Sequence, residues 1–249
     1  MIRLAAGLAV LSATLLLQTT GARELMTLGE VLLFNAPDLP PDADAKAFQQ
    51  LLATIGPKPP EPGVTVHLFQ RDRGSQKGQH ALVWTVDTLK RRREHLAMGN
   101  AVKGNIEYHL VAPETVGALP EVDVLGLHYT SVRPDRTEAF ERFVSEKLHP
   151  AVGNLRPDLR ILYYKAVRGA DAGSYVALFA LTRASRDKYW PGGSDSDDLR
   201  AAFKPVQGLT KELSTFLVED SYLADPKFAA AVYESRRWAD FVLVSAVAR

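Results

Sequence analysis

The sequence contains no cysteine, and this absence removes several kinds of chemistry at once. A chain without cysteine has no disulfides, no thiolate metal ligands, no cysteine nucleophile and no lipid-modified cysteine as a membrane anchor. At 249 residues it is long enough for one large domain or two small ones. The fold must therefore be stabilised by its hydrophobic core.

Motifs for nucleotide binding, serine hydrolysis and helical zinc binding are also missing. Gly192-Gly193 lacks the glycine spacing and the lysine of a phosphate-binding loop, and there is no Gly-x-Ser-x-Gly sequence. No two histidines have the i, i+4 spacing of a zinc site on a helix. Glu107 and His109 are predicted to face the same side of a strand, but two ligands are too few for a metal site. We therefore expect no bound metal.

The charge balance argues against a nucleic-acid partner. Without residues 1–22, whose one charged residue is Arg3, the chain has 29 basic and 29 acidic side chains. Nucleic-acid binding needs an excess of Lys and Arg gathered on one face. The basic run Lys90-Arg91-Arg92-Arg93 is typical of a solvated helix face.

Residues 1–22 have the pattern of a secretory signal peptide. A positive charge near the start precedes an uncharged apolar run at 4–17, and the small residues Thr20-Gly21-Ala22 follow. The run is too short and too rich in alanine to favour a stable membrane span. We therefore predict a periplasmic or secreted mature protein without an integral membrane domain. The alternative is an uncleaved N-terminal membrane anchor.

The remaining chain contains two copies of one unit. Residues 64–95, VTVHLFQRDRGSQKGQHALVWTVDTLKRRREH, align without a gap on residues 159–190, LRILYYKAVRGADAGSYVALFALTRASRDKYW, so that Gly78 falls on Gly173. We predict a first repeat over residues 23–117 and a second over 118–249, the second carrying an inserted helical segment at about 190–235.

Within each copy the hydrophobic period changes in the order strand, helix, strand, strand, helix, strand. This is the ferredoxin-like β-α-β-β-α-β order of an α+β fold. Pairing the first hairpin about its turn places His67, Phe69 and His80 on one face, with Val66 and Ala81 on the other. Because both faces are largely apolar, each sheet needs cover on two sides. Helices supply one cover and the sheet of the other repeat supplies the second, which predicts an intrachain pseudo-dimeric α+β barrel.

Two fused ferredoxin-like units, together with the stretch FERFVSEKLHPAVGNLRPDLRILYY at 140–164, resemble the dimeric α+β barrel superfamily. Its members often carry a histidine at the end of a helix, and His149 matches that position, whereas the first repeat has Pro57 there. The superfamily includes cofactor-free monooxygenases, lactone isomerases, haem-degrading enzymes and proteins of unassigned activity. The resemblance therefore implies a fold and no single function.

Four side chains of the second repeat are candidate ligand contacts. Tyr164 and Tyr175 are predicted to lie on one apolar sheet face and to bring two hydroxyls to it, although ordinary core packing would use them equally well. His128 ends the first strand of the repeat, and strand ends often open onto clefts. His149 falls about half a turn from Phe140 on an ideal helix, so it should point away from the apolar stripe. Its position in a last helical turn also suits the helix dipole.

Two functions of different class remain open. The first is an exported, non-enzymatic barrel that binds a small apolar or aromatic molecule, and the lack of a catalytic constellation favours it. The second is a cofactor-free or haem-dependent enzyme of the same superfamily, with His149 or His128 as proton carrier or axial ligand. The non-enzymatic binding protein would need no cofactor. The sequence leaves the oligomeric state open.

Overall fold

The computed structural model describes residues 26–37, 39–55, 63–73, 76–94, 106–112, 121–153, 155–169, 172–218 and 238–247. The predicted signal peptide at 1–22, its cleavage site and Pro57 lie outside these residues. No helix in these ranges is long and apolar enough to cross a membrane.

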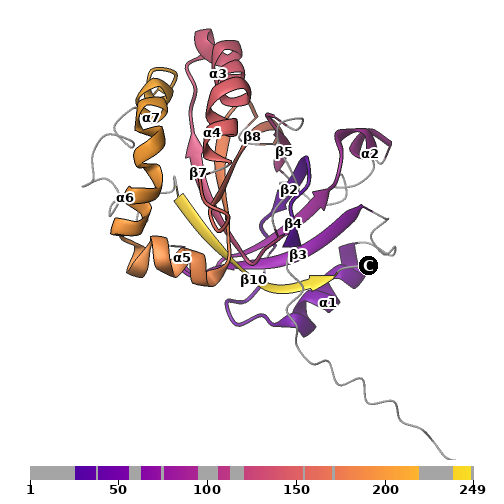
Figure 1. The fold of residues 1–249 in the computed structure, drawn as a ribbon. Coiled ribbons are helices and arrows are strands. Elements are labelled where there is room, and N and C mark those ends of the chain that lie inside the picture. Colours follow the sequence, from indigo (N-terminus) through magenta and orange to yellow (C-terminus); the bar gives the residue numbers. More distant parts are fainter. Residues whose placement is uncertain are drawn as a thin grey trace, which may run out of the picture.

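Long strands from both repeats form one closed barrel (Figure 1). Around the barrel their order is β10-β3-β4-β2-β5-β8-β9-β7, and β7 pairs with β10 to close it. In chain order these strands are β2 (Val31–Asn35), β3 (Val64–Arg71), β4 (His80–Val86), β5 (Ile106–Leu110), β7 (Val124–Thr130), β8 (Arg160–Arg168), β9 (Tyr175–Leu181) and β10 (Trp238–Val247). Two short strands, β1 (Met26–Thr27) and β6 (Glu121–Val122), pair separately.

The strand order divides the barrel into two ferredoxin-like sheets. The first repeat supplies β5-β2-β4-β3 and the second supplies β10-β7-β9-β8, so in each sheet the last strand pairs with the first. The sheets join at two seams, where β5 pairs with β8 and β10 pairs with β3. The predicted α+β barrel of two fused repeats within one chain is therefore confirmed.

Helices pack around the outside of the barrel (Figure 1). The first repeat has α1 and α2, and the second repeat has α3 to α7, with a π-helical turn between α3 and α4. The described part of the predicted helical segment at about 190–235 contains α6, a 3-10 turn that includes Pro205, and α7. The helix bounds are α1 (Ala45–Ile55), α2 (Leu89–Glu94), α3 (Thr137–Phe143), π-turn (Val144–Leu148), α4 (His149–Val152), α5 (Arg183–Tyr189), α6 (Asp197–Phe203) and α7 (Gln207–Ser214).

Two layers of side chains make the core. One fills the barrel interior and includes Leu32, Phe69 and Leu178. The other lies between the second-repeat sheet and its helices and includes Phe140 and Phe216. An eight-stranded barrel is just wide enough for its interior to be filled by side chains, so the interior is core and not a channel.

A bulge in each hairpin sets which residues face the interior. The Arg71 carbonyl accepts from the Gly78 amide at 2.7 Å, and the Arg71 amide donates to the Gln79 carbonyl at 2.9 Å. Arg71 on one strand therefore lies opposite two residues, Gly78 and Gln79, on the other. The second hairpin repeats this pattern with Ala166 opposite Gly173 and Ser174. Both glycines have φ of +91°, as expected for a bulge that begins with glycine.

The bulge overturns the predicted hairpin faces. Phe69 lies opposite Ala81 and His67 opposite Val83, so His67 and Phe69 share the interior face with Ala81 and not with His80. The extra residue shifts the pairing by one position, and a shift of one moves every side chain of one strand to the opposite face. His67 is consequently enclosed, and burial lowers its pKa to about 4.

We expect Gly173→Ala to lower the free energy of unfolding by about 1 kcal/mol, because an L side chain is strained at positive φ. A Cβ at this position would meet nothing within 4 Å, so the change tests the backbone alone. Gly208→Ala is the matched control, since it lies in α7 and also has open space around it. Alanine should stabilise that helix by about 0.5 kcal/mol. Urea unfolding of both variants measures the two changes, and equal effects would contradict the assigned bulge.

Candidate functional site

The helix-facing surface of the second-repeat sheet carries a group of polar side chains on an apolar wall. Two cross-strand rows can be followed from the register: Tyr163 lies opposite Ala177, which lies opposite His128, and Lys165 lies opposite Tyr175, which lies opposite Thr130. Directly opposed residues share a sheet face, with Cβ atoms about 5 Å apart. The small side chain of Ala177 therefore separates Tyr163 from His128.

Tyr163 is the most unusual member of this group. Its side chain is buried against the helices, and its ring lies 6.4 Å from that of Phe140. Burial raises its pKa, so the hydroxyl is neutral and keeps its proton. This hydroxyl makes no hydrogen bond to another described residue, whereas the hydroxyls of Tyr164 and Tyr175 are both bonded within the described residues. An acceptor from outside the described residues would satisfy it.

Tyr175 belongs to a network at the edge of the same surface. Its hydroxyl donates to Glu141 Oε1, and Lys165 Nζ donates to the same oxygen at 2.7 Å. Burial would raise the pKa of Glu141, but these two hydrogen bonds outweigh it and lower the pKa. Burial, followed by the Glu141 carboxylate, raises the pKa of Tyr175. The result is a charged acid held by a neutral hydroxyl and a cation, with Glu141 and Lys165 each about one-third exposed at 35%.

His128 lies on this surface as predicted, but deep under the helices. It is buried, and its Nδ1 lies 3.5 Å from Thr130 Oγ1, at the limit of a hydrogen bond. The neighbouring aromatic rings of Phe140 and Tyr175 are in edge contact at 4.7 Å. The arrangement places hydroxyl and imidazole groups on one apolar surface.

Tyr164 lies elsewhere, and the predicted common face of Tyr164 and Tyr175 is wrong. In the observed register Tyr164 lies opposite Val176 and Tyr175 opposite Lys165, because of the hairpin bulge. Tyr164 therefore points into the barrel, where its hydroxyl donates to the Gly29 carbonyl at 2.8 Å. A side chain at Gly29 would place its Cβ 2.1 Å from the Val86 carbonyl oxygen, so only glycine fits there. Tyr164 has a structural role.

His149 is buried, so the prediction that it points away from the apolar stripe is also wrong. The turn before it, at 144–148, is π-helical, and a wider turn rotates the following residue relative to an ideal helix. Burial, followed by the charge of Arg160, lowers the pKa of His149, and a hydrogen bond with the Ile161 main chain opposes this shift. That bond joins the helix end to β8. His149 and His128 are both enclosed by the surrounding protein.

The equivalent surface of the first repeat carries a different set of side chains, with Gln70 and His80 at the positions of Lys165 and Tyr175. Leu68 and Leu82 occupy the positions of Tyr163 and Ala177, and Asn35 occupies that of His128. Leu68 and Leu82 pack on Phe48 of α1 in an apolar cluster. Within the described residues, no group of three His, Cys, Asp or Glu side chains could hold a metal ion.

Sequence reasoning missed Tyr163, Lys165 and Glu141 as members of the site. Tyr163 is the neighbour of Tyr164, the residue that was predicted to belong to the site. The glycine after each hairpin turn is the sequence signal for the bulge, since glycine adopts the positive φ that such a bulge needs. Glu141 follows the buried Phe140 on α3, so its place beside the sheet depends on tertiary packing. No short-range pattern predicts that contact.

Comparison with known proteins adds little beyond the fold. No protein-family model matches the sequence, and no curated protein matches it either. Among solved structures, an anthrone oxidase-like protein is 10% identical, with 87% of this chain and 91% of that chain covered and a TM-score of 0.46. A protein proposed to be a monooxygenase from Lactobacillus acidophilus NCFM is 10% identical, with 87% of this chain and 94% of that chain covered and a TM-score of 0.45. A haem-degrading enzyme from Listeria monocytogenes is 11% identical, with 85% of this chain and 98% of that chain covered and a TM-score of 0.42.

We expect Tyr163→Phe and Tyr175→Phe to differ in stability. Loss of the Tyr175 hydroxyl removes a donor from the charged Glu141 and should lower the free energy of unfolding by about 1 kcal/mol. Loss of the Tyr163 hydroxyl, which makes no hydrogen bond to another described residue, should change it by less than about 0.5 kcal/mol. Chemical unfolding of the two variants measures the difference. An equal loss would show that the Tyr163 hydroxyl has a partner within the protein.

Proposed function

We propose that this protein is an exported α+β barrel that binds a small apolar or aromatic molecule between the second-repeat sheet and its helices. The ligand would carry a hydrogen-bond acceptor, such as a carbonyl or ether oxygen, that faces the Tyr163 hydroxyl. Apolar walls with a few polar groups are typical of small-molecule sites.

Tyr163 is a buried residue whose hydroxyl makes no hydrogen bond to another described residue, and this observation carries the proposal. Leaving a buried polar group unsatisfied costs about 1–3 kcal/mol, and phenylalanine would avoid that cost with the same packing. The first repeat has Leu68 at this position, so the fold itself does not require a tyrosine. An acceptor on a ligand would recover the cost.

The alternative is a cofactor-free or haem-dependent enzyme of the same superfamily. Glu141, Tyr175 and Lys165 could move a proton at the edge of the surface, but each is already bonded to another member of the network. An absorbance band after reconstitution with haem would favour the enzyme over the binding protein.

Thermal-shift screening with a panel of aromatic ketones and phenols tests the site. We expect compounds that raise the unfolding temperature of the wild type to bind Tyr163→Phe about tenfold more weakly, because they lose one hydrogen bond, and so to raise its unfolding temperature less at the same concentration. Tyr164→Phe is the matched control, since the adjacent hydroxyl faces the barrel interior. Stabilisation that survives Tyr163→Phe, or that is lost equally in both variants, would overturn the proposal.

Export is tested separately. Protein recovered from the cell envelope should have an N-terminus at or near Arg23, because the small residues before it complete the signal pattern. Mass spectrometry of the intact protein measures this. An N-terminus at Met1 on soluble protein from the cytoplasm would refute it.

A further inference from the structure

The helix over the sheet surface around Tyr163 is interrupted just before His149 (Figure 1). α3 runs into the π-helical turn, and the His149 amide donates to the Val144 carbonyl, which lies five residues back instead of the usual four. Such turns are rare in proteins as a whole, and many of them lie at functional sites. The interruption separates α4, a helix of four residues at His149–Val152, from α3.

His149 adopts a backbone conformation that the following proline disfavours. Its φ of −61° and ψ of −46° are those of a right-handed helix, and Pro150 comes next. A proline ring crowds the preceding residue in this conformation and favours an extended backbone there. A helix as short as α4 is also not stable by itself. Contacts with the rest of the protein must therefore hold α4 in place.

The His149 side chain attaches α4 to the sheet. Its imidazole hydrogen-bonds the Ile161 main chain on β8, and the residue is buried. Ile161 and Tyr163 alternate along β8, so both side chains face the helices. Val152 at the other end of α4 packs in the same apolar cluster as Tyr163. α4 therefore covers β8 beside Tyr163, and its attachment depends on a group that can take up a proton.

Protonation of His149 would weaken this attachment. Burial, followed by the charge of Arg160, lowers the pKa of the imidazole and so favours its neutral form. The same Arg160 donates through Nη1 to the Gly153 carbonyl at 2.5 Å, at the end of α4. On the preceding turn Glu146 and Lys147 are exposed, and no acidic side chain among the described residues forms an ion pair with His149. A protonated His149 would be a buried cation beside a second cation, which is unfavourable.

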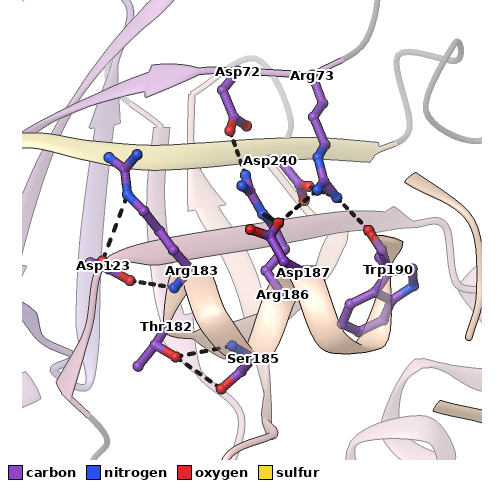
Figure 2. Close-up of polar contacts among 10 residues, drawn as sticks. All are labelled: Asp72, Arg73, Asp123, Thr182, Arg183, Ser185, Arg186, Asp187, Trp190 and Asp240. Atoms are coloured by element: carbon purple, nitrogen blue, oxygen red, sulfur yellow. Dashed lines mark hydrogen bonds and ion pairs between the residues drawn. The ribbon is translucent and has the colours of Figure 1, made fainter. Parts of the chain in front are cut away.

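The helix α5 packs on the same sheet but is held by groups that keep their charges in mild acid (Figure 2). Arg186 on α5 pairs with Asp72 of the first repeat, and Arg73 of the first repeat pairs with Asp187 on α5 at 2.9 Å. Carboxyl groups ordinarily titrate at about pH 4 and guanidinium groups above about pH 12, whereas histidine titrates at about pH 6.5. In mild acid α5 should therefore stay in place, whereas a hydrated His149 would take up a proton.

We propose that α4 is a proton-controlled latch on the ligand site near Tyr163: neutral His149 holds α4 against β8, and protonated His149 releases it. The proposal rests on the proposed function of that site, although the latch can be tested without a ligand. In the released state His149 is hydrated and adopts the extended backbone that Pro150 favours. The closed state is fully favoured above about pH 6.5. For each pH unit below this value the ratio of closed to released molecules falls by up to about tenfold, until the lowered pKa of the buried ring is reached.

Because the chain has no cysteine, one introduced thiol can measure the opening. The residue changed in Ala177→Cys lies opposite Tyr163 on the helix-facing side of the sheet. Its rate of reaction with a pyridyl disulfide, divided by the rate for the same full-length variant unfolded in urea, reports how often the surface is exposed. We expect this relative rate to rise by up to about tenfold for each pH unit below about 6.5. Adding His149→Gln, which supplies a hydrogen-bonding group that stays neutral, should abolish the rise.

Ala166→Cys is the matched control, because Ala166 faces the barrel interior and its thiol should stay protected throughout. An equal rise in both cysteine variants would show that the whole barrel opens and would overturn the proposal. So would a relative rate that does not change with pH, or one that rises equally with His149→Gln. Amide exchange of the wild type is a second measurement: residues 144–153 should lose protection over the same pH range while α5 does not, and unchanged protection at 144–153 overturns the latch. A failure to find any ligand would count against the proposed function and leave these results as they are.

Discussion

Pairing of strands between the two repeats is the interaction on which the rest of the structure depends. Each ferredoxin-like sheet has two edge strands, and the outer edge of each has no partner within its own repeat. These strands are β3 and β5 in the first repeat and β8 and β10 in the second. Exposed strand edges promote aggregation, and closure into a barrel removes them. Closure also covers the inner apolar face of both sheets, so the edges and the core are satisfied by one arrangement.

Much of this arrangement can be predicted from the sequence. The ungapped repeat and the change of hydrophobic period give the element order, and the two apolar faces of each hairpin require that the sheets cover each other. The last strand in the predicted order of the second repeat is β10, Trp238–Val247. Such features depend on local pattern and on the need to bury apolar surface. They are strong signals because every residue of a strand contributes to them.

The details that decide the site were not predictable in the same way. One inserted residue at each hairpin bulge exchanges the two sheet faces, so Tyr163 and not Tyr164 faces the helices. A π-helical turn likewise rotates His149 into the core. The helical part of the repeat also needs a one-residue gap, since Thr88 and Thr182 are 94 positions apart whereas the hairpins are offset by 95. Single-residue shifts of this kind leave composition and mean period unchanged.

The two repeats share one fold but differ on the surface between sheet and helices. Leu68 and Leu82 fill the positions that Tyr163 and Ala177 occupy in the second repeat, so an apolar side chain fits where Tyr163 lies. The architecture therefore does not itself require a tyrosine at this place. The Tyr163 hydroxyl adds a donor that the first repeat lacks, and this difference between two copies of one fold is the basis on which a ligand is proposed for the second repeat.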